Sequence, residues 1–457
     1  MASPKANIRV AIIGGGIGGL ALANRLRDTG ISATVYERDS DDGSRAQGYQ
    51  LGIQKDGFDA LMKAIPDLDV DAIFDTKFGM TSFTITDPQL RTLLNIGNPQ
   101  PEGRKQMPGT VNRVALRQAL AASLKRNSKG DGHVAGILYG KKFNSFAKVD
   151  GGERVVAHFH DGSDTGPVDV LVGADGARSL LRALLFPEIE YKQMPVLNIG
   201  ASVALDDLPS FRKPGSRLAA VMTPRNTASL VRAVDRNGSS ILLLPWQDRA
   251  TGRDSMVWSV TLAVGDTEQR KLENATTGDK QQDLGRFLHD LCRERASAAA
   301  YAAEIQEAIA CTTPEQLVFT ASLDSVHCHS IQLPKNLKIN PTRVVLLGDA
   351  AHATTTHAGL GANTALQDAI DLAEKIIAVA DAGDLRQLPS AMEEYHRIMF
   401  KRGAKVIGMS TGNTGMVTSS GWRATVRDVV LKVVFASVKI WRGVKSLFSS
   451  AGRVHPL

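Results

Sequence analysis

Residues 344–352 read Val-Val-Leu-Leu-Gly-Asp-Ala-Ala-His, so a carboxylate follows directly after a short apolar run. The run from Val344 to Leu347 is aliphatic and β-branched, which is typical of a strand buried on both faces of a sheet. Gly348 and Asp349 stand where this strand ends, at the sheet edge where α/β proteins bind ligands. An apolar-periodic helix opens after a glycine-bearing loop that contains Gly359, Gly361, Ala362 and Asn363. An ordinary strand–loop–helix with a solvated aspartate also fits this stretch alone.

A glycine-rich turn follows the first apolar run of the chain, Ile8 to Ile13. It has the Gly-x-Gly-x-x-Gly spacing, with glycines at Gly14, Gly16 and Gly19. Such glycines permit a tight turn, close approach of a pyrophosphate and close packing of the next helix. We expect that helix to run from Ile17 to about Thr29, followed by a strand from Ser32 to Tyr36. Glu37 then lies at the position where a carboxylate binds the diol of a ribose. A carboxylate there favours FAD or NAD over NADP, and the neighbouring Arg38 weakens this preference.

A second carboxylate stands at a predicted strand end, because Val168 to Val172 leads into Gly-Ala-Asp-Gly with Asp175 and Gly176. Between the two units, residues 112–125 read as a helix with Asn112 as its N-cap. Arg113 and Arg117 are four residues apart and therefore share one helix face. Either arginine can reach the ribityl–phosphate region of a dinucleotide or can simply be exposed to solvent. Arg45 also has two interpretations: it binds a phosphate or the nicotinamide donor, or it is a solvated arginine in a loop.

The composition is that of a soluble globular chain, with 457 residues, 43% of them hydrophobic and 22% charged. The net charge is +7, but the basic residues are scattered and only 5% of residues are aromatic, so we expect no nucleic-acid partner. Three cysteines give no disulfide framework and fit a reducing compartment. We see no signal peptide and no apolar run long enough to span a membrane, and we expect a cytoplasmic protein. His327-Cys328-His329 lacks a second ligand pair, so no metal site is expected.

The motifs together resemble the group A FAD-dependent monooxygenases, the aromatic hydroxylase family with the fold of para-hydroxybenzoate hydroxylase. The resemblance rests on residues 14–19 with Glu37, residues 173–176 with Arg182, and residues 348–352 with the glycine loop after them. Within this family, the sequence is similar in pattern to the tetracycline-inactivating and secondary-metabolite tailoring members. It implies an α/β fold with a Rossmann-like FAD-binding domain, an inserted, mostly antiparallel β-sheet substrate domain and C-terminal helices.

The resemblance implies FAD as the cofactor and NADPH or NADH as a transiently bound co-substrate. It assigns Glu37 to the adenosine ribose, Arg113 to FAD, Asp349 to the ribityl chain, and Asp175 to both FAD and the pyridine nucleotide. The full set of expected cofactor-binding residues is Gly14, Gly16, Gly19, Glu37, Arg38, Arg45, Arg113, Arg117, Asp175, Gly176, Gly348, Asp349, Ala350, Gly359, Gly361, Ala362 and Asn363. No acid–base pair stands out, since the flavin carries the chemistry. The only catalytic candidates are His357, which also fits a structural loop histidine, and Arg232.

One position departs from the family pattern, because Thr356 stands where a proline usually follows the histidine at residue 352. Proline would fix the backbone beside the flavin, so the sequence leaves the rigidity of this loop open. We expect FAD-binding segments at residues 1–75, 111–185 and 336–385, substrate-domain segments at 76–110 and 186–335, and C-terminal helices at 386–457. The substrate sheet is predicted to contain strands at Leu197–Leu205, Arg217–Thr223, Ala228–Asp235, Ser239–Pro245 and Ser255–Val264.

The last predicted helix, Arg423 to Phe448, is basic and amphipathic. This pattern favours docking on the protein itself over lying on a membrane. We expect a monomer or homodimer that uses NAD(P)H and O2 to hydroxylate or epoxidise an electron-rich aromatic or polycyclic small molecule through a flavin C4a-hydroperoxide. Secondary-metabolite biosynthesis or xenobiotic modification would be its setting. A flavin reductase or dehydrogenase that never oxygenates and a non-catalytic FAD-binding sensor remain alternatives, whereas the Trp-x-Trp-x-Ile-Pro pattern of flavin halogenases is absent.

Overall fold

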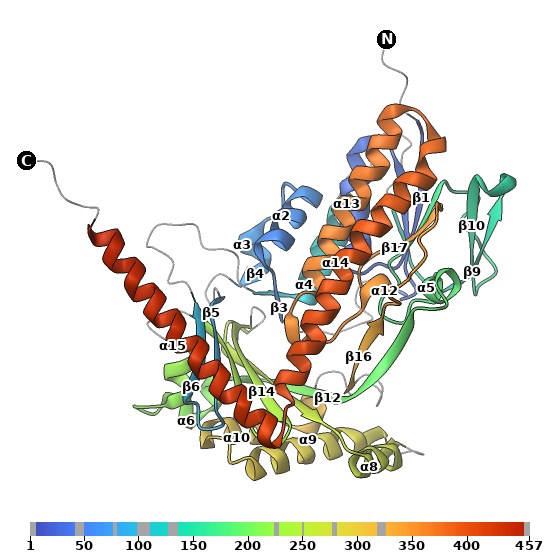
Figure 1. Cartoon of the computed structure of the whole chain (residues 1–457). Helices are drawn as coiled ribbons and strands as arrows, with labels where there is room; N and C mark the ends of the chain where they lie inside the picture. Colours follow the sequence, from blue (N-terminus) through green and yellow to red (C-terminus); the bar gives the residue numbers. More distant parts are fainter. Residues whose placement is uncertain are drawn as a thin grey trace, which may run out of the picture. The chain divides into compact units, whose positions relative to one another are not determined.

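The computed structural model describes residues 6–41, 50–75, 80–97, 110–126, 136–223, 228–248, 251–276, 281–317 and 326–451 (Figure 1). The chain forms two compact units that are each assembled from three segments. Unit 1 contains Met1–Thr76, Met107–Met194 and His329–Asn413. Unit 2 contains Lys77–Gln106, Pro195–Cys328 and Thr414–Leu457.

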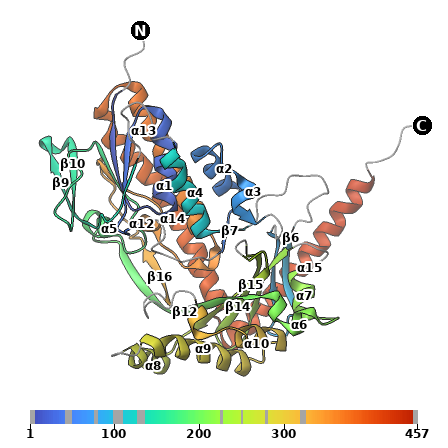
Figure 2. The ribbon, with the colours of Figure 1, turned by 180° about the vertical axis from the view of Figure 1, so that it is seen from behind.

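Unit 1 is built on a five-stranded parallel sheet with the order β17-β11-β1-β2-β8. Its strands are β17 (Val344–Leu346), β11 (Val170–Gly173), β1 (Arg9–Ile13), β2 (Ser32–Tyr36) and β8 (Gly136–Leu138). The residues of β17 are fully buried, as expected for aliphatic strands with helices on both faces. Figure 2 shows α1 (Ile17–Leu26) beside α4 (Arg113–Arg126) and α13 (Gly361–Ala382), and α1 packs against both.

The remaining elements of unit 1 are smaller, apart from one long helix. A three-stranded sheet has the order β3-β7-β4, and β9 pairs with β10 as an antiparallel hairpin. These strands are β3 (Gln50–Gly52), β7 (Thr110–Asn112), β4 (Phe74–Asp75), β9 (Phe143–Val149) and β10 (Arg154–Phe159). The helices are α2 (Lys55–Ala64), α3 (Val70–Ile73), α5 (Leu180–Leu185), α12 (Asp349–His352) and α14 (Leu388–Val417), whose last four residues belong to unit 2.

Unit 2 is organised around a seven-stranded sheet with the order β16-β12-β15-β14-β13-β5-β6. Its strands are β16 (His327–Gln332), β12 (Glu190–Ala204), β15 (Asp254–Ala263), β14 (Ser239–Gln247), β13 (Ala228–Val234), β5 (Met80–Thr86) and β6 (Thr92–Gly97). Residues 329–332 of β16 and 190–194 of β12 fall within the segments of unit 1. The pairs β12–β15, β15–β14, β14–β13 and β5–β6 are antiparallel, and β13 pairs with β5 in parallel. The helices are α6 (Pro209–Arg212), α7 (Arg217–Met222), α8 (Asp266–Thr276), α9 (Gln281–Ala298), α10 (Ala303–Ala310) and α15 (Gly421–Ala451).

The predicted fold class is confirmed, because a Rossmann-like parallel sheet, a mostly antiparallel sheet and C-terminal helices are all present. The predicted strand at Arg217–Thr223 is wrong, because these residues form α7. The Ser216 hydroxyl caps that helix by accepting a hydrogen bond from the Ala219 N–H at 3.2 Å. The leucine, alanine and methionine residues that follow are good helix formers, so local propensity decides this segment. In the described part of the chain, no helix combines the length and hydropathy needed to span a membrane.

Candidate cofactor-binding site

The three sequence motifs meet at one edge of the parallel sheet in unit 1. The register pairs Ile13 with Tyr36 on one side and with Gly173 on the other, and Gly173 pairs with Leu346. The Ala174 N–H donates to the Ile13 carbonyl at 2.8 Å, beside the first glycine of the fingerprint. The turns that follow β1, β2, β11 and β17 therefore leave the sheet side by side, as parallel strand ends must.

The glycine fingerprint has the geometry of a cradle for a phosphate group. Gly14 has φ +111°, and a Cβ there would lie 2.3 Å from the Ala174 carbonyl oxygen. A Cβ on Gly19 would lie 2.2 Å from the Gly14 carbonyl oxygen, so helix and turn pack too closely for a side chain. A Cβ on Gly16 would have nothing within 4 Å, and no side chain caps the N terminus of α1 there. The uncapped N terminus of α1, with free space at Gly16, fits the pyrophosphate of a dinucleotide.

Glu37 and Arg117 hold the turn from its two sides. The Glu37 carboxylate is buried and accepts hydrogen bonds from the Gly15 N–H at 2.7 Å and the Asp39 N–H at 2.9 Å. Arg117 Nε donates to the Gly15 carbonyl at 2.8 Å, and its Nη2 lies 3.8 Å from Glu37 Oε2. Arg38 is exposed beside them. Contact of Glu37 with a ribose, and of Arg38 and Arg117 with a dinucleotide, stays a prediction.

Asp175 carries an oxygen without a hydrogen-bond partner. One carboxylate oxygen accepts from the Leu180 N–H at 3.0 Å, while Oδ1 is buried with no partner among the described residues. Burial raises the pKa of Asp175, and hydrogen bonds from Ser179 and nearby backbone groups oppose this effect. A buried polar atom of this kind needs a partner, which fits a cofactor or co-substrate group at this edge. Gly176 beside it has φ +83°, and a Cβ built on it would lie in open space.

The Gly-Asp-Ala-Ala-His stretch turns sharply out of β17 into α12. Gly348 has φ +62°, and a Cβ there would lie 2.9 Å from Ala365 Cβ in α13. Asp349 is exposed, and a Cβ on Gly361 would lie 3.6 Å from its Oδ1, so the carboxylate stands at the start of α13. No side chain caps α13, and its first turn contains no acidic residue. A polar chain and a negatively charged ring both fit such a position.

A buried charge network lies behind this turn, and the sequence interpretation did not identify it. Asp368 of α13 is fully buried and accepts hydrogen bonds from Gly348 N–H at 3.1 Å, His352 Nε2 at 2.6 Å and Arg402 Nη2 at 2.6 Å. Burial lowers the pKa of His352, but the charge and hydrogen bond of Asp368 outweigh it and leave that pKa raised. Burial also raises the pKa of Asp368, but the two cations outweigh it and leave that pKa lowered. The network thus fixes Gly348 by a paired carboxylate.

The loop that lacks the family proline is anchored by α14 instead. Thr355 is buried, and its hydroxyl lies 2.6 Å from the Ser410 hydroxyl, which also donates to the Thr355 carbonyl. Asn413 Nδ2 donates to the carbonyl of His357 at 3.2 Å. Thr356 itself is exposed. Side-chain hydrogen bonds to the helix therefore hold backbone that a proline ring would otherwise restrict.

The other predicted site residues have varied surroundings. Asn363 is buried, and its amide bonds Gln54 N–H, Gly52 O and Gly359 O, so it ties β3 to the start of α13. Arg45 lies outside the described residues. Arg113 is half-buried at the start of α4, and the Ala350 carbonyl accepts a hydrogen bond from Arg182 at 3.0 Å. Gly359 has φ +63°, and Ala362 lies in the first turn of α13. Cofactor contact by each of these residues stays a prediction.

The two catalytic candidates belong to different units. His357 is half-buried in unit 1, in the loop that α14 anchors. Arg232 is buried in β13 of unit 2, where Nη1 donates to the Ser240 hydroxyl at 3.1 Å. Burial lowers the pKa of Arg232 to about 10, and nearby Tyr301 and Cys328 oppose this. A catalytic role for either residue stays a prediction.

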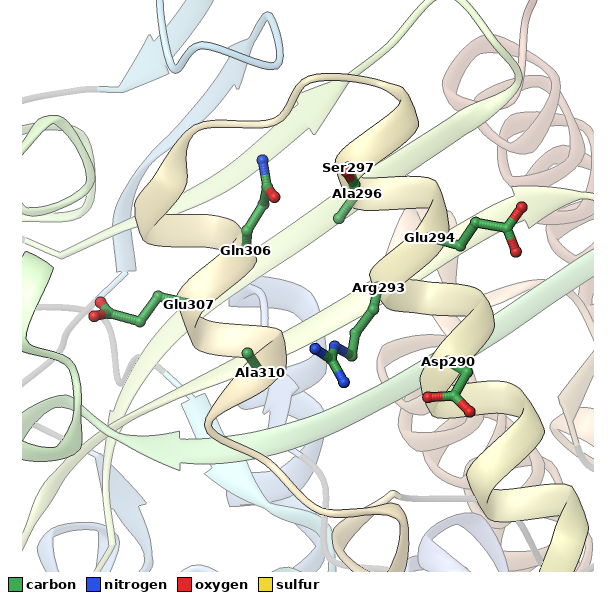
Figure 3. A pocket seen from close by; sticks show the side chains of 8 residues that line it. All are labelled: Asp290, Arg293, Glu294, Ala296, Ser297, Gln306, Glu307 and Ala310. Atoms are coloured by element: carbon green, nitrogen blue, oxygen red, sulfur yellow. The ribbon is translucent and has the colours of Figure 1, made fainter.

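Unit 2 has an open depression of about 520 Å³ between α9 and α10. Figure 3 shows its lining, in which Asp290, Arg293 and Glu294 come from α9 and Gln306 and Glu307 from α10. Ligand pockets for aromatic molecules are mostly apolar, so this charged depression is a poor candidate for the substrate site. Among the residues that the structure describes, no cluster of His, Cys, Asp or Glu is placed to hold a metal ion.

Comparisons with known proteins agree with this geometry. Residues 7–331 and 336–406 match the family described as FAD binding domain. The chain is 28% identical over 402 residues to the dual O-methyltransferase/FAD-dependent monooxygenase elcB of Phaeosphaeria nodorum, covering 82% of this chain and 41% of that protein. The chain thus spans about two fifths of the length of that relative. It is 24% identical over 423 residues to the FAD-dependent monooxygenase nscC of Arthroderma otae, covering 90% of this chain and 94% of nscC.

A solved structure extends the likeness to the fold. It is the crystal structure of a candidate FAD-containing monooxygenase from Photorhabdus luminescens. Its sequence is 26% identical to that of this chain, and the TM-score between the two structures is 0.68. The match covers 90% of this chain and 99% of that one. The predicted resemblance is confirmed by these matches together with the motif-bearing sheet edge. The chain belongs to the FAD-binding family of the aromatic hydroxylase type.

Proposed function

We propose that the chain is an FAD-dependent monooxygenase that takes electrons from NADPH or NADH. It inserts one atom of O2 into an electron-rich aromatic or polycyclic small molecule, by hydroxylation or epoxidation. The relatives elcB and nscC, both named as FAD-dependent monooxygenases, support this reaction class. Secondary-metabolite biosynthesis or xenobiotic modification is the setting that we propose for it. The observation that carries the proposal is the convergence of the three motifs on one edge of the parallel sheet.

The residues at this edge divide the work of binding. The N terminus of α1 and the turn at Gly14 and Gly16 hold the pyrophosphate, because the helix end is uncapped and the turn leaves room for it. Asp349 would bind the ribityl hydroxyls of FAD, and the N terminus of α13 would favour negative charge placed beside it. Bound FAD supplies electron transfer from the pyridine nucleotide and the activation of O2, which side chains cannot provide.

Asp175 is assigned to the pyridine-nucleotide step. Its Oδ1, which has no partner among the described residues, would accept a hydrogen bond from the cofactor or co-substrate, and this would relieve the cost of a buried carboxylate oxygen. Asp169 offers a matched control, because it is buried just before β11 and accepts from the Arg9 N–H at 2.8 Å at the opposite end of that strand. We expect D175N to lower the rate of flavin reduction by NADPH at least ten-fold, as loss of a charged hydrogen bond does. D169N is expected to keep that rate.

The reaction class is tested with isotopically labelled oxygen. The FAD-loaded chain is incubated with NADPH, 18O2 and a panel of phenols and polycyclic aromatic compounds, and products are examined by mass spectrometry. A product that carries one 18O atom, with NADPH consumption stimulated by that compound, is the expected result. NADPH consumption that yields only hydrogen peroxide across the panel would favour the reductase alternative. A chain that binds FAD but never consumes NADPH or NADH would favour the sensor.

A further inference from the structure

The last helix, α15, packs one of its faces on unit 2. Leu431 is buried and Phe435 partly buried in a cluster with Ile85, Leu93 and Val234. The helix runs along β6, as both views of the ribbon show (Figure 1, Figure 2). This confirms the expectation that the helix docks on its own protein, for the face that carries these residues.

Polar contacts at the start of α15 fix its rotation. Arg427 is buried and donates from Nη2 to the Asp235 carbonyl at 2.6 Å. Arg236 Nε bonds Asp428 Oδ2 at 3.0 Å, and the Gly421 N–H donates to the Arg236 carbonyl at 3.0 Å. The turn between β13 and β14 thereby holds the helix at a defined angle about its axis. The face that points to solvent is therefore set by the fold.

That outward face is apolar, which is unusual for an exposed helix surface. Seven large apolar side chains between residues 422 and 440 keep 43–73% of their surface exposed. We call this set the outer ridge, and it consists of Trp422, Val426, Val429, Val430, Val433, Val434 and Ile440. At 1.5 Å per residue it extends over about 27 Å of helix. Exposed apolar side chains gathered over this length of one helix mark an interaction site.

The charge of α15 identifies the kind of partner. The helix sequence holds six basic residues and one acidic residue, Asp428, which is buried against Arg427 and Arg236. The basic residues Arg423 and Lys432 are exposed beside the outer ridge, and the Arg423 guanidinium lies 5.7 Å from the Trp422 ring centre. A basic helix with an apolar, tryptophan-bearing face matches an anionic lipid surface, where headgroups supply the opposite charge.

We propose that the outer ridge of α15 binds the surface of an anionic membrane, with the helix lying along the interface. A second copy of the chain is a poorer occupant. A two-fold contact through this helix would bring two basic surfaces together, and the only acidic side chain of α15 is already buried. In this arrangement the helix attaches to one leaflet, with its basic side chains at the headgroups.

Vesicle flotation of the full FAD-loaded chain tests the proposal. Vesicles of phosphatidylcholine alone are compared with vesicles of phosphatidylcholine and phosphatidylserine, at low and at high salt. We expect the chain to float with the anionic vesicles, and high salt to weaken that binding. Equal behaviour with both vesicle types, or no flotation with either, would overturn the proposal.

Paired variants separate the apolar and the charged contributions. V429Q/V433Q is expected to reduce binding roughly 100-fold, because two exposed valines are lost from the interface. V429I/V433I keeps the apolar ridge and is expected to bind at least as well as the wild type. R423Q/K432Q is expected to bind about 30-fold less, at roughly five-fold for each basic residue. K213Q/K271Q removes two exposed charges elsewhere on unit 2 and should leave binding unchanged.

Each variant is expected to fold, because the substituted side chains are exposed. Circular dichroism and the flavin spectrum check this. Light scattering of the wild type and V429Q/V433Q follows the oligomeric state in the absence of lipid. An unchanged mass for both proteins, with vesicle binding lost only in V429Q/V433Q, supports the membrane assignment. A wild-type dimer that V429Q/V433Q dissociates, without vesicle binding by either, would show that a second copy covers the ridge and would overturn it.

Discussion

Replacing Asp368 by asparagine tests whether the buried network behind β17 maintains the cofactor site. The carboxylate is fully buried and bonds Gly348, His352 and Arg402 at 3.1, 2.6 and 2.6 Å. Removing one partner of a buried ion pair costs about 3–5 kcal/mol. Arg402 keeps Asp371 at 2.7 Å, and His352 can release its proton, so we expect D368N to cost about 3 kcal/mol, at the lower end of that range.

Two measurements separate stability from binding. Urea unfolding of the chain without FAD, followed by circular dichroism, gives the free energy of unfolding of D368N and wild type. Flavin fluorescence titration gives the FAD dissociation constant, which we expect to rise at least ten-fold in D368N, because Gly348 loses its charged hydrogen-bond acceptor. The two effects are expected together, since the same carboxylate holds the turn and balances the cations.

Asp371 provides the control, because it bonds the same Arg402 guanidinium from a partly exposed position. Such a pair contributes about 1 kcal/mol or less, so D371N should lose little stability and keep its FAD affinity. Equal losses in D368N and D371N would refute the reasoning, because they would show that Arg402 alone accounts for the effect. Normal FAD affinity in D368N would refute the link from this network to the site.

Three further predictions concern the turn, the loop and pH. G16A is expected to keep the unfolding free energy of the FAD-free chain and to weaken FAD binding at least ten-fold, because a methyl group there meets no protein atom within 4 Å but blocks the cradle. G14A, in contrast, should lose about 2–3 kcal/mol of unfolding free energy through its clash and positive φ, and wild-type-like flavin titration of G16A would contradict the assignment. S410A should lose about 1–2 kcal/mol, because it removes the hydroxyl that anchors Thr355, and unchanged urea unfolding would argue against that anchor. The raised pKa of His352 means that the folded state favours its protonated form, so this contribution to stability is complete below about pH 6.5 and is lost as pH rises through the raised value. Urea unfolding across pH should show this decline in wild type and not in H352Q.

Local pattern was sufficient to predict the elements that carry the motifs. The strand at Ser32–Tyr36 and the helix start at Ile17 agree with the structure, because glycine turns and aliphatic runs act over a few residues. The Asn112 cap is also present, with its side chain accepting from the Val114 N–H at 2.9 Å. Convergence of the motifs on one edge follows from the parallel order of the strands.

Long-range partners were beyond the reach of sequence pattern. Asp368 reads as an ordinary helix residue, and its meaning depends on Gly348, His352 and Arg402, which reach it from 16 to 34 residues away. The compensation for the missing proline likewise depends on Ser410, 55 residues from Thr355. The apolar outer face of α15 was visible as periodicity, but which face docks on unit 2 depends on contacts made across 192 residues by Arg427.

The most direct test of the central claim is the visible absorption spectrum of the full chain after incubation with FAD and removal of free cofactor. We expect the two bands of an oxidised flavin in equimolar amount, which bleach on addition of NADPH or NADH and recover in air. G16A should show much weaker bands under the same conditions, although its circular dichroism matches the wild type. A folded wild-type chain that stays colourless after incubation with FAD would contradict the cofactor assignment and the monooxygenase function built on it.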